Sequence, residues 1–316
     1  MVRMLVARGH TPVVVDSLEY GHKEAIPTSV PLIIGNIKDK TVLDPIFSAY
    51  KIEAVLHFAG YLMVEESVRD PIKYMKNNTI APMTLLAVMQ EYGVDKIIFS
   101  SSAAVYGNPS IIPIPESHAK NPTSPYGLSK WCFEELLRVT DYQHHIKSIS
   151  LRYFNACGAS LDGKFGEAHN PETHIMPLAI RTAMGKQKEF MLYGTDYPTR
   201  DGSCLRDYIH VEDLAEAHLL ALDALTKGHQ TDVYNLATGE GTTNKEVVAA
   251  VEKVTGIHFP VKKMGRRAGD PHSLVADATR FQKEFRWKPM YSGIETIVSS
   301  AFKWHKSHPN GYEDRH

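Results

Sequence analysis

The chain has 316 residues, with 35 lysines and arginines against 36 aspartates and glutamates, so its formal net charge is −1. A near-neutral chain without blocks of one sign offers no electrostatic basis for binding nucleic acid or an anionic membrane. No apolar run reaches the ~20 residues that span a bilayer. The three cysteines form no paired motif, which is typical of a reducing compartment, and we expect a cytoplasmic protein.

The first elements resemble half of a dinucleotide-binding unit. Residues 2–9 predict a helix that stops at Gly9, and residues 12–16 predict a strand that ends in Asp16. In a βαβ unit an acid at this place binds the adenosine ribose hydroxyls, although Asp16 is also consistent with a simple turn. No strand and no glycine-rich loop precede this helix, so we expect a chain that starts late, through a misplaced initiation codon or as a fragment.

The next elements continue an α/β pattern. Residues 33–37 predict the end of a strand, and residues 54–60 predict a strand followed by a turn of small residues. His57 within this strand is more consistent with packing than with ligand binding. A long helix is predicted over 71–92, because Pro71 suits a first helical position and Gly93 suits a stop.

Two segments carry the candidate chemistry. Ser102 lies at the end of a predicted strand, and Tyr126 and Lys130 share one face at the start of a predicted helix. A cation ~4 Å from a phenol contributes about 4 kcal/mol at an effective dielectric near 20, or about three pKa units. Lys130 would therefore bring the pKa of Tyr126 near 7, where a general base works best. Taken alone, the Tyr–Lys pair also fits a surface helix, and Ser102 also fits a strand-end cap.

The second half of the chain begins with a glycine-punctuated loop. His169 and His174 lie five apart in this loop, a spacing for which the sequence offers no metal-ligand partner, so we expect no metal. His174 is also consistent with an ordinary polar residue in a surface loop. Beyond the loop we predict strands at 190–194 and 233–236, and helices at 212–225, 281–287 and 294–308.

Together these segments resemble a known family. The Ser100–Gly107 and Tyr126–Lys130 stretches resemble the active site of the extended short-chain dehydrogenase/reductase superfamily. Further motifs resemble the UDP-glucose (UDP-galactose) 4-epimerases, and the resemblance covers nearly the whole chain. These motifs are residues 57–60, 151–155, 193–199, 206–211 and 266–270.

The resemblance implies a Rossmann-type doubly wound parallel sheet with a smaller mixed α/β substrate lobe, here without the first strand and glycine loop. It implies an NAD-binding domain over 1–155 and 208–238 and a UDP-sugar lobe over 156–207 and 239–316. It also implies a homodimer formed through the 71–92 and 126–142 helices.

The resemblance further implies the site residues. The implied catalytic residues are Tyr126, Lys130 and Ser102. NAD binding falls to Asp16, Asn36, Ile37, Phe58, Ala59, Gly60, Asn78, Ser100, Tyr126, Lys130 and Tyr153. Binding of UDP-glucose or UDP-galactose falls to Ser102, Phe154, Asn155, His174, Ile175, Tyr193, Arg206, Arg267, Asp270 and Leu274.

The implied reaction, a step of galactose metabolism, inverts C4 of the sugar through a transient 4-keto intermediate while NAD stays bound. One alternative is a nucleotide-sugar 4,6-dehydratase, but Ala103 and Ala104 follow Ser102, where that elimination needs an acid. A second alternative is an impaired or non-catalytic NAD or nucleotide-sugar binder that lacks the glycine loop. Leu274 stands where some relatives carry a bulky tyrosine, so we expect some conversion of N-acetylated UDP-sugars.

Overall fold

The computed structural model describes residues 1–267 and 271–313. The chain divides into two compact units, and each is described by itself. Unit 1 comprises Met1–Pro109, Glu116–Tyr153 and Ala217–Asn235, and unit 2 comprises Ser110–Pro115, Phe154–Glu216 and Leu236–His316. Helix α8 (Val211–Thr226) and strand β10 (Asp232–Leu236) each continue from one unit into the other. Within residues 1–267 and 271–313, no helix has both the length and the apolar character needed to cross a bilayer.

The main sheet of unit 1 has four strands in the order β10-β5-β4-β3, and β3, β4 and β5 run parallel. This confirms the predicted parallel sheet. Strand β4 continues through the serines that follow its apolar run, so that Ser102 lies opposite Tyr153 in the register. The strands are β3 (Val55–His57), β4 (Lys96–Ser102) and β5 (Lys147–Tyr153).

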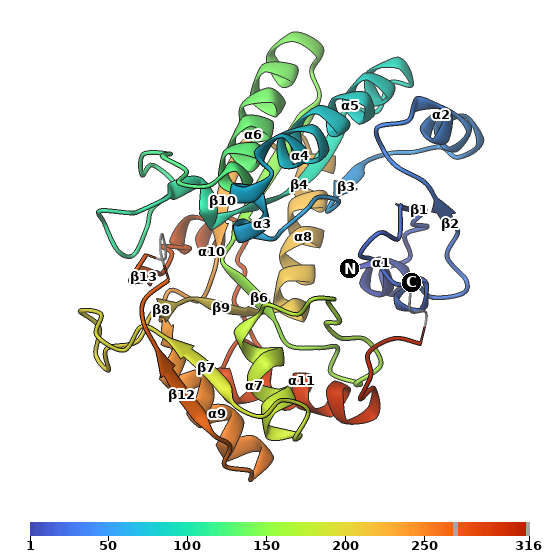
Figure 1. Cartoon of the computed structure of the whole chain (residues 1–316). Coiled ribbons are helices and arrows are strands. Elements are labelled where there is room, and N and C mark those ends of the chain that lie inside the picture. Colours follow the sequence, from blue (N-terminus) through green and yellow to red (C-terminus); the bar gives the residue numbers. More distant parts are fainter. Residues whose placement is uncertain (268–270, 314–316) are drawn as a thin grey trace. The chain divides into compact units, whose positions relative to one another are not determined.

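Strands β1 (Val14–Asp16) and β2 (Leu32–Ile34) form a separate parallel pair (Figure 1). Strand β2 ends before Gly35, earlier than the expected strand end at 33–37. Among the described strands, β1 pairs only with β2, and β3 pairs only with β4. The described strands of unit 1 therefore form two separate groups, β1-β2 and β10-β5-β4-β3. Helix α1 (Val2–Ala7) precedes β1, and Gly9, the predicted helix stop, has a φ of 83°.

The helix predicted over 71–92 is present but is not uniform. It consists of α4 (Pro71–Met75), a π-helical turn at Lys76–Ile80, and α5 (Ala81–Glu91). A π turn contains an extra residue, which changes the direction of the side chains within it. This turn carries Asn78 inward, where its side chain is 2% exposed.

Helix α6 (Pro125–His144) carries the predicted Tyr–Lys pair and begins as the sequence suggests. The side chain of Ser124 accepts a hydrogen bond from the backbone N–H of Gly127 at 3.1 Å, and Pro125 occupies the first turn. The helix ends at His145, which adopts a left-handed conformation. The other helices of unit 1 are α2 (Lys40–Ala49) and α3 (Val64–Arg69), with 3-10 turns at Lys23–Ala25 and Ala103–Tyr106.

An apolar core fills the space between the sheet of unit 1 and its helices. It holds buried side chains of α2, α5, α6, β4 and the segments between them. These residues are Leu43, Leu85, Leu86, Val88, Met89, Val94, Ile97, Phe99, Phe133, Leu137 and Ile146.

Unit 2 is a mixed α/β assembly in which α7, α9 and α11 pack on one another (Figure 1). Their apolar faces and strand β7 form its core, which includes Met176, Phe190, Val251 and Val298. The helices are α7 (Ile175–Ala183), α9 (Asn244–Thr255), α10 (Thr279–Glu284) and α11 (Ile294–Ser307). The strands are β6 (Asn155–Cys157), β7 (Phe190–Tyr193), β8 (Leu205–Arg206), β9 (Tyr208–His210), β11 (Thr242–Thr243), β12 (Val261–Met264) and β13 (Ser273–Leu274).

Candidate active site

The structure brings Ser102, Tyr126 and Lys130 together at the carboxyl end of β4. Ser102 caps the 3-10 turn that follows β4, and its hydroxyl accepts a hydrogen bond from the N–H of Ala104 at 3.2 Å. The side chain of Ser102 lies close enough to the Tyr126 phenol to lower its pKa. The Lys130 Nζ lies 5.9 Å from the centre of the Tyr126 ring. The three groups therefore lie near one another at this edge of the sheet.

The electrostatics of this trio differ from the sequence-based expectation. Burial raises the pKa of Tyr126 above its usual value, and the nearby Ser102 side chain only partly opposes this increase. Burial also lowers the pKa of Lys130 to about 8, against the opposing influence of Glu134. The predicted lowering of the Tyr126 pKa by Lys130 is therefore wrong for this state. The cause is desolvation, which penalises the charged form of both groups.

Asn78 holds the turn that follows β3. Its side-chain oxygen accepts a hydrogen bond from the N–H of Tyr61 at 2.8 Å, and its side-chain nitrogen donates to the Tyr61 carbonyl at 2.9 Å. The same nitrogen donates to the hydroxyl of Ser129 at 3.2 Å, on the helix that carries Lys130. Asn78 thus fixes the β3 turn beside α6.

Gly60 makes this close approach possible. A Cβ atom added to Gly60 would lie 3.2 Å from the Asn78 Oδ1 and 3.5 Å from the Lys130 Nζ. The neighbouring Phe58 and Ala59 are exposed, and the Phe58 ring lies 4.9 Å from the ring of His218. His57, by contrast, is buried against Phe99, as expected for a packing residue.

Tyr153 and Ser100 form a second hydroxyl pair behind the trio. Their oxygens are hydrogen-bonded to each other, and Ser100 is buried. Burial raises the pKa of Tyr153 and keeps its phenol protonated, although the contact with Ser100 opposes this. Its ring also lies 5.8 Å from the ring of His218. Tyr153 is therefore suited to hydrogen bonding and ring contact rather than to proton abstraction.

The candidate residues for binding the adenosine part of a dinucleotide lie directly after strands β1 and β2 of unit 1. Asp16 Oδ1 accepts a hydrogen bond from the N–H of Leu18 at 2.8 Å. Asn36 Oδ1 accepts from the N–H of Lys38 at 3.0 Å, which leaves its side-chain N–H₂ and one lone pair for a ligand. Ile37 is partly buried and packs on the apolar core of unit 1.

These residues fit the ribose and nicotinamide parts of NAD. A carboxylate and an amide follow two parallel strands, where an open α/β sheet binds ligands. Gly60 has no side chain, so a ligand can approach its backbone closely beside Lys130. The buried ammonium of Lys130 can donate hydrogen bonds to ribose oxygens.

A buried ionic network that was not predicted from the sequence lies next to the trio. Arg152 and Glu134 form a pair whose side chains are each 3% exposed, with Arg152 Nε donating to Glu134 Oε1 at 2.8 Å. Ser101 donates a further hydrogen bond to Glu134, and Arg152 donates to the Tyr106 hydroxyl at 2.9 Å. The only signal in the sequence was the position of Glu134, one helical turn after Lys130.

In unit 2, three predicted substrate residues lie on strands that share hydrogen bonds. Arg206 on β8 pairs in register with Leu274 on β13, and the N–H of Asp207 donates to the Leu274 carbonyl at 3.0 Å. The side chain of Asn155 donates to the Asp207 carbonyl at 2.8 Å. Phe154 packs against a small alanine cluster. The hydrogen bonds of the Asp207 backbone therefore hold Arg206, Leu274 and Asn155 near one another.

Tyr193 and Arg267 form a further contact in unit 2. The guanidinium of Arg267 lies 4.2 Å from the centre of the Tyr193 ring. The adjacent Arg266 instead pairs with Asp196 at 2.9 Å. Arg267 is exposed, so its charge remains accessible to a ligand. The predicted substrate residue Asp270 lies outside the described residues.

His174 and Ile175 lie where α7 begins. Ile175 packs on the core of unit 2, whereas His174 Nδ1 is hydrogen-bonded to Glu167. His169 lies 3.1 Å from the same carboxylate, and Glu172 completes a group of four. The structure thus shows that Glu167 and Glu172 are the partners of His169 and His174, which the spacing in the sequence did not reveal.

The parallel sheet, with serine, tyrosine and lysine where β4 ends and α6 begins, defines an α/β protein of the short-chain dehydrogenase/reductase type. Residues 1–237 match the NAD dependent epimerase/dehydratase family, and the chain belongs to this family.

Among known proteins, a UDP-glucose 4-epimerase of Lacticaseibacillus casei is 43% identical over 314 residues, which cover 99% of this chain and 95% of that protein. A crystal structure of a UDP-glucose 4-epimerase matches with a TM-score of 0.97 at 43% identity, covering 99% of this chain and 95% of that one. The Bifidobacterium longum UDP-glucose 4-epimerase in complex with NAD⁺ and UDP matches with a TM-score of 0.92 at 36% identity, covering 98% and 95%.

Proposed function

We propose that this chain is an NAD-dependent UDP-glucose 4-epimerase that interconverts UDP-glucose and UDP-galactose through a transient 4-keto sugar. The observation that carries the proposal is the close approach of Ser102 and Tyr126 beside the buried Lys130. Similarity over nearly the full length to curated UDP-glucose 4-epimerases supports the same reaction.

The chain's own residues perform the proton transfers. Tyr126 accepts the proton of the sugar 4-hydroxyl, either directly or through the Ser102 hydroxyl, and later returns it to the 4-oxygen. Lys130 stabilises the phenolate that forms, since an ammonium nearby favours the charged form of a phenol. Because burial holds the pKa of Tyr126 high in the chain alone, the phenolate needs the positive charges of the loaded site.

NAD, when bound, supplies a hydride acceptor that later gives the same hydride back to the sugar. Asp16 and Asn36 would hold its adenosine side. Gly60, in the turn fixed by Asn78, and Lys130 would hold its nicotinamide side, together with Phe58, Ala59, Ser100 and Tyr153.

The residues of unit 2 are assigned to the nucleotide. Arg206 and Arg267 would bind the diphosphate, because a guanidinium suits phosphate oxygens. Tyr193 would stack on the uracil, and Asn155 and Leu274 would contact the sugar, together with Phe154, His174 and Ile175. Strong contacts with the nucleotide and weak contacts with the sugar would let the 4-keto sugar rotate between its oxidation and its reduction, so that its opposite face is reduced.

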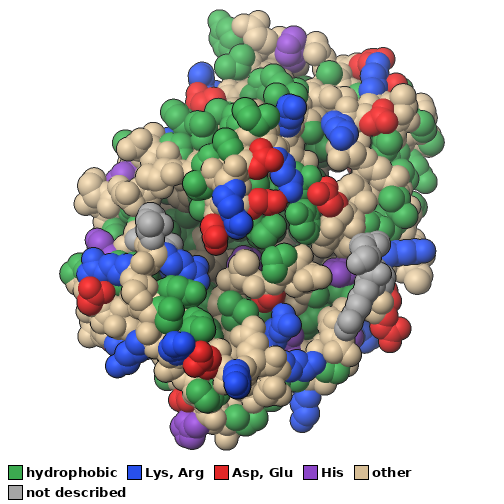
Figure 2. Space-filling view, viewed as in Figure 1, with side chains coloured by type: hydrophobic (Ala, Val, Ile, Leu, Met, Phe, Trp, Pro, Cys, Tyr) green, Lys and Arg blue, Asp and Glu red, His purple; other side chains and the backbone are tan. Residues whose placement is uncertain are grey.

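The chain acts in galactose metabolism, and it works in the cytoplasm, where the free thiols of Cys132, Cys157 and Cys204 would stay reduced. It forms a homodimer through the 71–92 and 126–142 helices. In the upper part of Figure 2, hydrophobic side chains lie at the surface where Figure 1 places α4, α5 and α6. These helices, with the π-helical turn between α4 and α5, expose Ile72, Ile80, Met83, Leu128, Val139 and Tyr142.

The test of the reaction is incubation of the purified chain with UDP-galactose, with and without added NAD, followed by chromatography for UDP-glucose. We expect UDP-glucose at equilibrium in at least the NAD-supplemented sample. Release of a dehydrated 4-keto-6-deoxy sugar, or no conversion by a folded chain that contains NAD, would contradict the proposal.

The dimer is tested by light scattering on Ile80→Lys. This change places a charge on a residue that is 56% exposed in the chain alone, and we expect monomers. Ile257→Lys, a substitution of an exposed residue in unit 2, is the control and should leave the mass unchanged. A monomeric wild type would refute the proposed dimer.

A further inference from the structure

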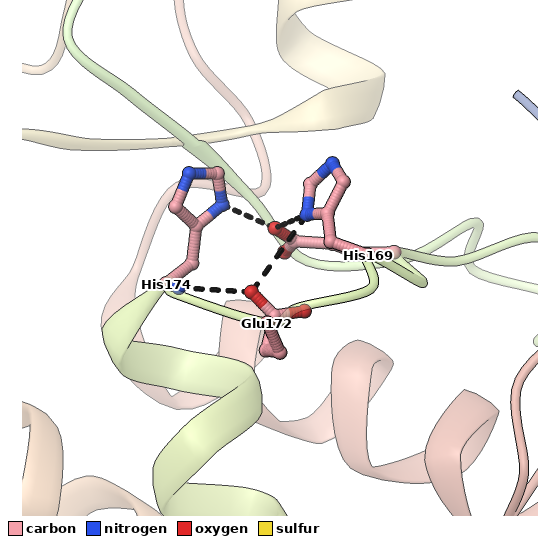
Figure 3. Close-up of side chains that lie close together, drawn as sticks. His169, Glu172 and His174 are labelled. Carbon is pink, nitrogen blue, oxygen red and sulfur yellow. Dashed lines mark hydrogen bonds and ion pairs between the residues drawn. The ribbon is translucent and has the colours of Figure 1, made fainter. Parts of the chain in front are cut away.

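One loop of unit 2 gathers two imidazoles and two carboxylates immediately before α7. The four residues are Glu167, His169, Glu172 and His174, and one ligand atom from each lies within 4.8 Å of all the others. Figure 3 shows the side chains of His169, Glu172 and His174 pointing toward one another. The proposed reaction already employs His174, but it gives no role to the other three residues.

The contacts inside this cluster are not those of a fully satisfied hydrogen-bond network. The His169 Nδ1 atom is buried and lies 3.1 Å from Glu167 Oε1 and 3.7 Å from Glu172 Oε1, yet it has hydrogen-bond geometry to neither oxygen. A nitrogen that faces two carboxylates in this way suits either a proton on the imidazole or a cation that the nitrogen and both carboxylates bind.

The carboxylate of Glu172 is held in place by the backbone. Its Oε1 accepts hydrogen bonds from the N–H groups of Thr173 and His174, both at 2.8 Å, and its side chain is 3% exposed. Hydrogen bonds to a ligating carboxylate are a recurrent feature of metal sites, because they fix the orientation of the ligand. Glu167 is similarly enclosed, with a side chain that is 16% exposed.

The donor set favours zinc among the biological cations. Imidazole suits zinc and the later transition metals, whereas magnesium and calcium prefer sites made only of oxygen. Two carboxylates balance the charge of one divalent ion. A tetrahedral zinc with bonds of about 2.1 Å separates its ligand atoms by about 3.4 Å. Side-chain rotations could therefore close the cluster around an ion, without a change of fold.

We propose that Glu167, His169, Glu172 and His174 bind one zinc ion. All four coordination positions come from the chain, which is typical of a structural site and leaves none for a substrate. The ion would tie the loop over 166–174 to the first turn of α7. It would also fix the ring of His174 through Nδ1, whereas the other ring nitrogen faces away from the cluster (Figure 3).

The experiment measures metal binding directly. Chelator-treated wild type is titrated with zinc chloride by calorimetry, and the zinc retained after dialysis is measured by mass spectrometry. We expect one tightly held zinc per chain and a higher melting temperature with zinc than without. Cobalt(II), used as a spectroscopic substitute, should give the intense visible bands of tetrahedral coordination.

The variants separate this site from chance binding. His169→Asn and Glu172→Gln should each weaken zinc binding by at least about tenfold, the effect of losing even a supporting partner of a metal ligand. His258→Asn is the matched control, because His258 faces a single glutamate, Glu252, at 3.2 Å and is exposed. This control should bind zinc like the wild type.

Two results would overturn the proposal. One is a wild type that retains no zinc, which would mean that protons alone hold the cluster together. The other is equal zinc binding by wild type and by folded His169→Asn. Circular dichroism establishes that each variant is folded, and the wild-type cobalt spectrum decides the matter even if both variants fail to fold.

Discussion

The ammonium of Lys130 donates a hydrogen bond to the carbonyl oxygen of Ser100 at 3.0 Å. This bond joins α6 to β4 two residues before Ser102. Lys130 therefore has a positional task as well as an electrostatic one, because it holds the helix that carries Tyr126 against the strand that carries Ser102.

Lys130→Met removes the charge and this bond while it keeps much of the side-chain volume. We expect kcat to fall by about 10²–10³, the scale of an acid–base contribution, because the phenolate loses its cation. The Kd for UDP should stay unchanged. Steady-state kinetics and calorimetry measure the two quantities. Lys51→Met, a change of an exposed lysine, is the control, and an equal loss of kcat in both variants would refute this role.

Tyr126→Phe deletes only the hydroxyl that transfers the proton. We expect kcat for UDP-galactose to fall by about 10³, with melting temperature and UDP binding retained. Tyr50→Phe removes a comparable hydroxyl from a tyrosine that is 40% exposed, and it should keep full activity. If Tyr126→Phe kept the wild-type rate, another group would have to serve as the base.

Arg267→Ala removes a guanidinium that lies over the Tyr193 ring. The loss of a phosphate contact should weaken UDP binding by about tenfold, or about 1.4 kcal/mol. KM should rise while kcat changes little, because the nucleotide is held equally throughout the reaction. Arg266→Ala is the control, since Arg266 is engaged with Asp196. Equal UDP affinity in the two variants would show that Arg267 does not contribute to binding of the nucleotide.

Leu274→Tyr tests the size of the sugar site. Leu274 pairs in register with the phosphate candidate Arg206, so a larger side chain there would occupy space beside the bound nucleotide sugar. We expect kcat/KM for UDP-N-acetylglucosamine to fall at least about tenfold relative to that for UDP-glucose, a difference within the range of steric discrimination. Rejection of UDP-N-acetylglucosamine by the wild type would contradict this expectation.

His57 predicts a specific dependence of stability on pH. Burial, assisted by the charge of Lys130, lowers the pKa of His57 to about 3 from its usual 6.5. Between these values the unfolded chain binds a proton that the folded chain does not, so acid destabilises the fold. From pH 6.5 to 4.5 this effect is about 2 kcal/mol.

The variant His57→Phe should lack this part of the pH dependence. Urea unfolding of both proteins at pH 6.5 and 4.5 measures it, and any constant packing cost of the larger ring between Phe99 and Phe133 cancels in the comparison. Identical loss of stability in both proteins would show that His57 does not contribute.

Local patterns predicted the strand that ends at Ser102 and the helix that carries Tyr126, but they did not predict α2, α7 or α9. Pro125 and Gly93 mark helix ends in both sequence and structure, because their backbone limits act within a few residues. The sequence did not reveal Glu134 beside Arg152, nor the cluster around His169, because these contacts depend on folding. The placement of Ser102, Tyr126 and Lys130 was predictable, but the pKa of Tyr126 was not, since desolvation depends on the surrounding atoms.

The π-helical turn between α4 and α5 takes up one additional residue within a continuous helical segment. Because the turn absorbs this residue, the side chains of α4 and α5 keep the faces that they would have in an uninterrupted α-helix. Removing one residue from the turn would therefore preserve the apolar face that α5 presents to the core, but it would lose the inward direction of Asn78. One additional backbone unit thus lets one helical segment both pack on the core and hold the turn that follows β3.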